Sequence, residues 1–260
     1  MKPKKSLGQN FLNSGYVVTT IIGASELKSD SVVLEIGPGK GVLTEKLLAN
    51  SGKVIAIEKD RELYGYLAEK FGAEIESDKL VLAEGDVLDF DPSTILEYSA
   101  RYKLVANIPY YITGAIIRKF LTADFSPESM TLLVQKEVAD RVVARDGKES
   151  MLSISVKAYG EPKYIKKVWR KDFTPAPKVD SAILYIDKIS KDNFYDVNET
   201  KFFEILRIGF AHKRKTLIKN LGELAGKEKL QEIFGEINLD KKIRPEDLTV
   251  ADWLELAKRL

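Results

Sequence analysis

The chain has 260 residues, of which 44% are hydrophobic, so it is long enough to bury one large core and carry a smaller domain beside it. Because it contains no cysteine and one histidine, the composition excludes a disulfide framework, thiolate metal sites and a histidine-built zinc centre, and we expect no metal at the functional site. The net charge of +2 is the small difference between 41 basic and 39 acidic residues, so the distribution of the charges matters more than their sum.

The first residues do not have the pattern of a signal peptide. Residues 1–5 are basic, but the polar residues 6–10 follow where an apolar stretch would be required. No other stretch is long and apolar enough to cross a membrane. We therefore expect a cytoplasmic protein that has no membrane partner.

The apolar runs of the first two thirds predict an α/β fold. They alternate with helical patterns and lie at residues 32–36, 54–57, 80–82, 104–106 and 130–134. This rhythm is typical of a parallel, Rossmann-like sheet covered by helices on both faces. Two later runs, 153–159 and 181–186, are joined without a clear crossover helix, so we expect them to pair antiparallel at one edge of this sheet.

A glycine-rich turn follows the first strand and precedes a predicted helix at 42–50. Glycines there allow the backbone to pass close to a ligand, but a dinucleotide fingerprint would have its third glycine at Val42. The spacing of Gly37, Gly39 and Gly41 therefore suits a ligand without a pyrophosphate. Glu58 ends the next strand about 20 residues later, where an acid can hold both hydroxyls of a ribose.

S-adenosylmethionine is such a ligand, with a ribose, an adenine, an amino-acid tail and a cationic sulfonium. Acidic residues at the ends of strands suit this cation. Asp86 follows the third strand and can accept a hydrogen bond from the adenine amine while Val87 packs on the ring. The alternative is that Asp86 only shapes a turn.

Asn107, Ile108, Pro109, Tyr110 and Tyr111 come directly after the fourth strand, at the edge of the sheet where ligands of such folds bind. The segment resembles the asparagine/aspartate-proline-aromatic motif of amino-directed methyltransferases. An exocyclic adenine amine must be held and polarised because its lone pair is delocalised into the ring. In this interpretation the Asn107 side chain and the Ile108 carbonyl accept the amine hydrogens, Pro109 fixes the turn and Tyr110 stacks on the base. The alternative is a proline turn that merely closes a loop.

A stiff loop at 173–181 follows a basic stretch and contains two prolines. Phe173 is our candidate for the opposite face of the target base, which would be flipped out or already single-stranded. The alternative is an ordinary core residue at the start of a strand.

Beyond about residue 188 the pattern is helical only, so we expect a catalytic domain at 1–188 and a helical RNA-binding or ribosome-binding domain at 189–260. Thr249 and Asp252 are placed as a capping box for the last helix. Basic residues cluster in three stretches, and a phosphate backbone is a natural partner for them, although a solvated lysine-rich face is the alternative. The basic clusters contain Lys2, Lys4 and Lys5, then Lys163, Lys166, Lys167, Arg170 and Lys171, and finally Lys213, Arg214, Lys215 and Lys219.

Taken together, these motifs resemble the ribosomal RNA adenine dimethyltransferase family, and within it the bacterial small-subunit (KsgA or RsmA) type, over essentially the whole length. The resemblance implies a class I methyltransferase sheet with a small C-terminal all-helical domain. It also implies that a segment at 6–12 closes over S-adenosylmethionine. The cofactor-binding residues expected from motifs and resemblance together are Gln9, Asn10, Leu12, Gly37, Gly39, Glu58, Lys59, Asp86, Val87 and Asn107.

The resemblance further implies transfer of four methyl groups to two adjacent adenosines near the 3′ end of 16S rRNA within an assembling 30S particle. We expect the enzyme to act as a monomer and to take part in small-subunit biogenesis. The sequence departs from the family pattern at Gly114-Ala115, in place of serine-proline, and at Glu149-Ser150, in place of tyrosine-glycine. Three alternatives remain: a resistance-type 23S rRNA methyltransferase, a non-catalytic ribosome-assembly factor and a DNA adenine methyltransferase.

Overall fold

The computed structural model describes residues 3–4, 7–94 and 101–260. Lys2, Lys5 and Ser6, which belong to the basic start and to the 6–12 segment, lie outside the described residues. The chain divides into two compact units. The first unit contains Met1–Ala139 and Pro162–Ile189, and the second contains Asp140–Glu161 and Ser190–Leu260.

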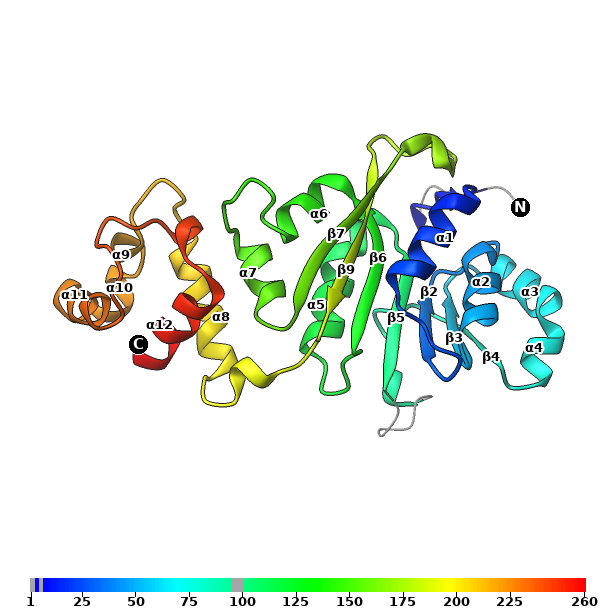
Figure 1. The fold of residues 1–260 in the computed structure, drawn as a ribbon, viewed down its shortest axis with the longest axis horizontal. Helices are drawn as coiled ribbons and strands as arrows, with labels where there is room; N and C mark the ends of the chain where they lie inside the picture. Colours follow the sequence, from blue (N-terminus) through cyan, green and yellow to red (C-terminus); the bar gives the residue numbers. More distant parts are fainter. Residues whose placement is uncertain (1–2, 5–6, 95–100) are drawn as a thin grey trace. The chain divides into compact units, whose positions relative to one another are not determined.

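A seven-stranded sheet is the centre of the first unit, in the order β4-β3-β2-β5-β6-β9-β7 (Figure 1). The strands from β4 to β6 pair in parallel, and β9 pairs antiparallel with β6. The predicted Rossmann-like sheet is confirmed. Its strands are β2 (Val32–Ile36), β3 (Lys53–Glu58), β4 (Leu80–Glu84), β5 (Tyr102–Asn107), β6 (Ser129–Gln135), β7 (Glu161–Val168) and β9 (Ser181–Asp187).

The middle strands are almost continuously apolar because they are covered on both faces. In β6, six of the seven residues are buried, and Val105 in the neighbouring β5 and Leu34 in β2 are fully buried. A core cluster joins these strands to Ile21 of α1 and Leu47 of α2. The helices of this region are α1 (Gly15–Ala24), α2 (Val42–Asn50), α3 (Arg61–Lys70), α4 (Gly72–Glu76), α5 (Thr113–Thr122) and α6 (Lys136–Val142).

The strand register brings the carboxyl ends of four strands to one edge of the sheet. Ile36 is paired with both Ile57 and Ala106, and Glu58 is paired with Glu84. The segments that follow β2, β3, β4 and β5 therefore leave the sheet side by side. A short antiparallel pair, β1 (Phe11–Leu12) with β8 (Phe173–Thr174), lies outside the main sheet.

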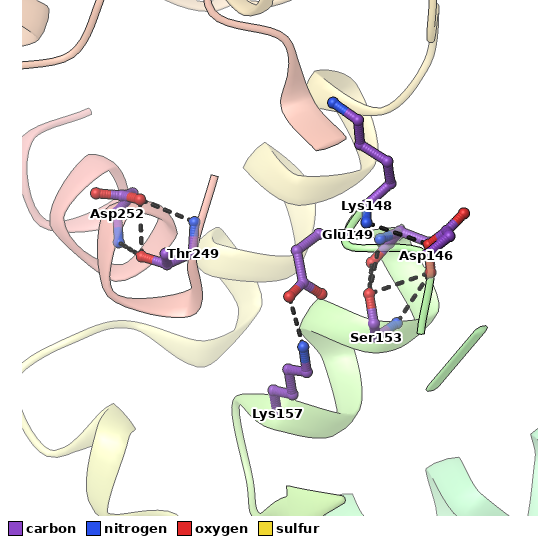
Figure 2. Close-up of polar contacts among 8 residues, drawn as sticks. Asp146, Lys148, Glu149, Ser153, Lys157, Thr249 and Asp252 are labelled. Carbon is purple, nitrogen blue, oxygen red and sulfur yellow. Dashed lines mark hydrogen bonds and ion pairs between the residues drawn. The ribbon is translucent and has the colours of Figure 1, made fainter. Parts of the chain in front are cut away.

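The predicted strand at 153–159 is wrong, because this segment begins within the helix α7 (Met151–Lys157). Its alternation of serine with apolar residues resembles a strand, but a capping box starts a helix: Ser150 Oγ accepts the Ser153 N–H at 3.1 Å, and Ser153 Oγ accepts the Ser150 N–H at 2.7 Å (Figure 2). The edge strand is β7 instead. This strand was not predicted because it contains several lysines and no apolar run, although lysine is a common residue on exposed sheet edges.

The second unit is helical, as predicted, but it is larger than the predicted domain 189–260 because it also includes Asp140–Glu161. Tyr159 explains this grouping, because its hydroxyl donates to Glu199 at 2.6 Å and its ring packs on Phe203 at a centroid distance of 6.0 Å. Contacts between residues far apart in sequence thus place the boundary of the helical unit elsewhere than the sequence pattern predicted. The remaining helices are α8 (Glu199–Gly209), α9 (Leu217–Asn220), α10 (Gly222–Ala225), α11 (Lys227–Glu236) and α12 (Val250–Arg259).

The predicted capping box of the last helix is confirmed, because Thr249 Oγ1 accepts the Asp252 N–H and Asp252 accepts the Thr249 N–H at 2.8 Å (Figure 2). Glu149, one of the departures from the family pattern, pairs at 2.5 Å with Lys157, the last residue of α7. The Glu149-Ser150 pair therefore helps to start and hold α7. Among the described residues, no helix has the length and apolar character needed to span a membrane.

Candidate active site

A cavity of 370 Å³ lies at the carboxyl edge of the sheet, within the first unit. The segments after β2, β3, β4 and β5 line it together with residues 7–12. The structure brings thirteen of the fourteen predicted site residues to this cavity, all except Phe173. They are Gln9, Asn10, Leu12, Gly37, Gly39, Glu58, Lys59, Asp86, Val87, Asn107, Ile108, Pro109 and Tyr110.

The glycine turn needs left-handed backbone at all three of its glycines. Gly37, Gly39 and Gly41 have φ angles of +64°, +61° and +75°, a region that residues with a Cβ rarely adopt. A Cβ added at Gly41 would lie 2.5 Å from the ring of Phe71, whereas one added at Gly37 would meet no atom within 4 Å. The backbone of Gly37 is therefore open to a ligand.

Glu58 is held in a fixed position at the end of β3. Its carboxylate accepts the Gly39 N–H at 3.0 Å and the Asp60 N–H at 2.8 Å, and only 5% of the residue is exposed. Burial raises the pKa of Glu58, and the two backbone hydrogen bonds oppose this shift. The oxygens keep further lone pairs that can accept hydrogen bonds from a ligand.

Glu35 is a functional candidate that the sequence reasoning missed. It is 1% exposed, it lines the cavity, and its Oε2 has no hydrogen-bond partner among the described residues. Burial raises the pKa of Glu35 to about 8, and the negative charge of Glu58 adds to this effect. The sequence signal that could have identified Glu35 is its position two residues before Gly37 of the glycine turn.

Asp86 and Lys59 lie together at the ends of neighbouring strands. Lys59 Nζ is 2.6 Å from Asp86 Oδ2, and the Leu88 N–H donates to Asp86 Oδ1 at 2.9 Å. The hydrogen bond from Lys59 lowers the pKa of Asp86. Asp86 is therefore an ionised acceptor, and the two donors, Lys59 and the Leu88 N–H, fix the orientation of its carboxylate. Val87, the next residue, is buried against the cavity.

The N-terminal segment crosses the cavity and is anchored at Asp60, a second residue that the sequence reasoning missed. Asp60 accepts hydrogen bonds from Lys4 Nζ at 2.6 Å and Gln9 Nε2 at 2.8 Å, and it also caps α3. Burial acts to raise the pKa of Asp60, but the bonds from Lys4 and Gln9 hold it below its ordinary value. Gln9 thus lines the cavity while its side chain binds this acid.

Asn107 ends β5, and its orientation is set by the N-terminal segment. Its Nδ2 donates to the carbonyl of Asn10 at 3.2 Å, so its Oδ1 is the atom available as an acceptor. Three residues later, the hydroxyl of Tyr110 lies 2.6 Å from Ser181 Oγ. An amide acceptor and a tethered aromatic ring therefore lie in the same cavity as the carboxylates.

A family model described as ribosomal RNA adenine dimethylase matches residues 1–260. The chain belongs to the ribosomal RNA adenine dimethylase family. Among its relatives, a ribosomal RNA small subunit methyltransferase A of Dehalococcoides mccartyi is 41% identical, covering 98% of this chain and 88% of the relative. The protein of the same name from Fusobacterium nucleatum is 37% identical, covering 99% and 97%.

Two solved structures that are more than 25% identical to this family member have the same fold. The 23S rRNA methyltransferase ErmE matches with a TM-score of 0.78 and 26% identity over 96% of this chain and 99% of that chain. A dimethyladenosine transferase from Plasmodium falciparum also gives a TM-score of 0.78, with 28% identity over 95% of each chain.

The cavity of this family member fits S-adenosylmethionine. The carboxylates of Glu58 and Asp86 suit a cationic ligand that carries ribose hydroxyls and an adenine amine, and the carboxyl group of Glu35 lines the same cavity. The partnerless Oε2 of Glu35 is an acceptor that no described residue uses. The left-handed glycine turn leaves space for the ligand beside the backbone of Gly37.

Phe173 is not among the residues that line the cavity, and its stacking role stays a prediction. It is 3% exposed and belongs to the core cluster that includes Leu12 and Val168. It lies in β8, paired with β1, so the alternative of a core residue at the start of a strand describes it.

Proposed function

We propose that this chain uses S-adenosylmethionine to dimethylate the N6 amines of two adjacent adenosines near the 3′ end of 16S rRNA. The observation that carries the proposal is the convergence of two residue sets on one cavity: the acids at the ends of β2, β3 and β4, and residues 107–110 at the end of β5. The names of the two bacterial relatives support the small subunit as the target.

In the proposed complex, residues at the carboxyl ends of β2, β3 and β4 would hold the cofactor. Glu58 accepts hydrogen bonds from the ribose hydroxyls, since Gly39 and Asp60 already hold its carboxylate. Asp86 accepts a hydrogen from the adenine amine, with Lys59 as its second partner. When bound, S-adenosylmethionine supplies an electrophilic methyl group on a cationic sulfonium.

The residues after β5 hold the target amine in this proposal. Asn107 Oδ1 and the carbonyl of Ile108 each accept one amine hydrogen, which directs the nitrogen lone pair toward the methyl group. The Asn107 amide is suited to this because its Nδ2 already donates to Asn10. Tyr110 stacks on the base. Positioning and charge complementarity then supply most of the rate enhancement.

No strong base is required in this mechanism. The methylated amine is cationic and therefore strongly acidic, so its proton passes readily to water or to the Asn107 oxygen after transfer. The same geometry accepts the monomethylated amine once more, with the remaining hydrogen held by one of the two acceptors. Two rounds at each adenosine give four methyl groups in total.

We further propose a cytoplasmic monomer whose substrate is the 30S particle, with the helical unit as the part that binds rRNA. The basic residues of this unit support the assignment, since His212, Lys213, Arg214 and Lys215 are all exposed in the turn after α8. A role in small-subunit biogenesis would follow from action on an assembling particle.

The test is transfer of labelled methyl groups from S-adenosylmethionine to purified 30S subunits that lack the modification, followed by nucleoside analysis. 50S subunits and duplex DNA are assayed in parallel. Dimethyladenosine from 30S subunits alone is the expected result. Labelling of 50S subunits would instead indicate a 23S rRNA methyltransferase, labelling of DNA a DNA methyltransferase, and cofactor binding without any labelling a non-catalytic assembly factor.

A further inference from the structure

Among the described residues of the first unit, two aromatic side chains outside the cavity lining are more than half exposed. Trp169, which directly follows β7, is 53% exposed, and Tyr16, in the first turn of α1, is 64% exposed. Large aromatic side chains usually bury most of their surface, because each removes a large apolar area from water. The exposure of both rings therefore indicates a surface that binds a partner.

A lysine lies over each of these rings. Lys166 Nζ lies 4.5 Å from the centroid of the Tyr16 ring and contacts its hydroxyl, which links β7 to α1. Lys167 Nζ lies 3.5 Å from the centroid of the Trp169 ring and pairs with Asp180 at 2.9 Å. These cations hold the rings in place at one side. The exposed side of each ring remains available for stacking.

The same surface carries exposed cations, and Asp180 accepts the backbone N–H of Arg170 at 3.1 Å. Lys166, Arg170 and Lys171 are all exposed, and no ion pair holds them within the residues that the structure describes. Exposed aromatic rings beside unpaired cations are typical of proteins that bind single-stranded nucleic acid, where bases stack and cations neutralise phosphates.

This surface is continuous with the rim of the cavity. The Asn13 N–H donates to the carbonyl of Asp172 at 2.9 Å, and Asn13 Nδ2 donates to Thr174 Oγ1 at 2.8 Å. Phe11, two residues earlier, pairs with Thr174 and lines the cavity. A strand of RNA that leaves the cavity over β1 and β8 would therefore meet this surface next.

We propose that Tyr16, Lys166, Trp169, Arg170 and Lys171 form an RNA-binding strip for the nucleotides that flank the target adenosine. A base stacks on Trp169, a second on Tyr16, and the cations contact the phosphates between them. The inference rests on the proposed function, because it takes single-stranded RNA as the substrate.

The fluorescence of Trp169 provides a direct test. The chain has two tryptophans, and Trp253 is fully buried, so emission that changes on contact with a ligand reports on Trp169. Titration of the full chain with a short single-stranded RNA of mixed sequence should quench the emission. The Trp169→Phe variant should lose this change and still bind. If anisotropy shows that the RNA binds but the tryptophan emission does not change, the proposed RNA-binding strip is wrong.

Substitutions test the energetic contribution. Trp169→Ala should weaken single-stranded RNA binding about tenfold. The Lys166→Gln and Arg170→Gln double variant should have a shallower slope of log binding constant against log salt concentration, by the amount expected for the loss of roughly one to two phosphate contacts. Tyr66→Ala on α3 and Lys46→Gln on α2, both exposed, are the matched controls and should change neither quantity. Cofactor affinity, measured by calorimetry, should be the same in all variants.

The outcomes separate the two proposals. If the wild-type chain neither binds nor methylates RNA, the proposed function fails and the strip fails with it. If the wild type methylates 30S subunits but the strip variants bind single-stranded RNA as tightly as the two controls, the strip alone is wrong. Reduced RNA affinity in the strip variants, with full cofactor affinity, supports it.

Discussion

The hydroxyl of Tyr110 lies 2.6 Å from Oγ of Ser181, which joins the loop after β5 to the first residue of β9. Ser181 is fully buried, so its position is set by the sheet. Burial raises the pKa of Tyr110 and its hydroxyl stays protonated at neutral pH. The bond therefore fixes the plane of a ring that we propose stacks on the target base.

Removal of this bond should slow methyl transfer without weakening the cofactor. Ser181→Ala is expected to lower kcat about threefold to tenfold, since a typical hydrogen bond contributes about 1 kcal/mol. Tyr110→Phe should have a similar effect, and the double variant should lose little more than either single variant. Additive losses, or an unchanged kcat, would show that the bond does not position the ring.

Asn107→Ala should lower the rate of methyl transfer by at least about a hundredfold, because it removes the proposed amine acceptor. Cofactor binding should be partly retained, since Glu58 and Asp86 are unchanged. The measurement is single-turnover transfer to 30S subunits, with calorimetry for the cofactor. Asn50→Ala, at the exposed end of α2, is the control. Activity equal to wild type would exclude the amine-holding role.

Glu58→Ala should weaken binding of S-adenosylmethionine roughly tenfold to a hundredfold, since it removes charged hydrogen bonds to the ribose. Calorimetry measures this affinity directly. Glu62→Ala, an exposed carboxylate in the first turn of α3, is the matched control and should bind as the wild type does. An unchanged affinity in Glu58→Ala would mean that the ribose assignment is wrong.

The buried Glu35 should make stability depend on pH. Its pKa is about 8 in the folded chain against an ordinary value of 4.5, so between these values the folded state keeps a proton that the unfolded state loses. This contribution is present below about pH 4.5 and is lost as pH rises through about 8, with a slope of up to about 1.4 kcal/mol per pH unit.

Glu35→Gln should therefore flatten the fall in unfolding free energy between about pH 5 and pH 8, measured by urea denaturation at several pH values. The exposed Glu62→Gln should keep the wild-type slope. A Glu35→Gln profile parallel to that of the wild type would contradict the raised pKa.

Much of the fold and most of the candidate site could be predicted because they depend on local patterns. Apolar runs identified the strands β2 to β6 and β9, and parallel strands place their carboxyl ends at one edge. Glu58, Asp86 and Asn107 each follow such a strand, so their convergence on one cavity required no knowledge of distant contacts.

The errors arose where local pattern and tertiary context disagree. The serine alternation at 153–159 resembled a strand, but a capping box favoured a helix, and the lysines of β7 concealed an edge strand. Phe173 has the residue type expected for base stacking, and its packing in the core could not be predicted from the sequence. Burial is decided by neighbours from other elements, which a single segment does not reveal.

The sequence by itself determined the family, the sheet and the residues at the strand ends, because each depends on spacing along the chain. Only the tertiary structure decided which groups become partners across long separations: Tyr110 with Ser181, Asp60 with Lys4 and Gln9, and Lys166 with Tyr16. Such pairs form because the sheet and its short strands bring distant segments together, and hydrogen bonding and burial depend on distance in space.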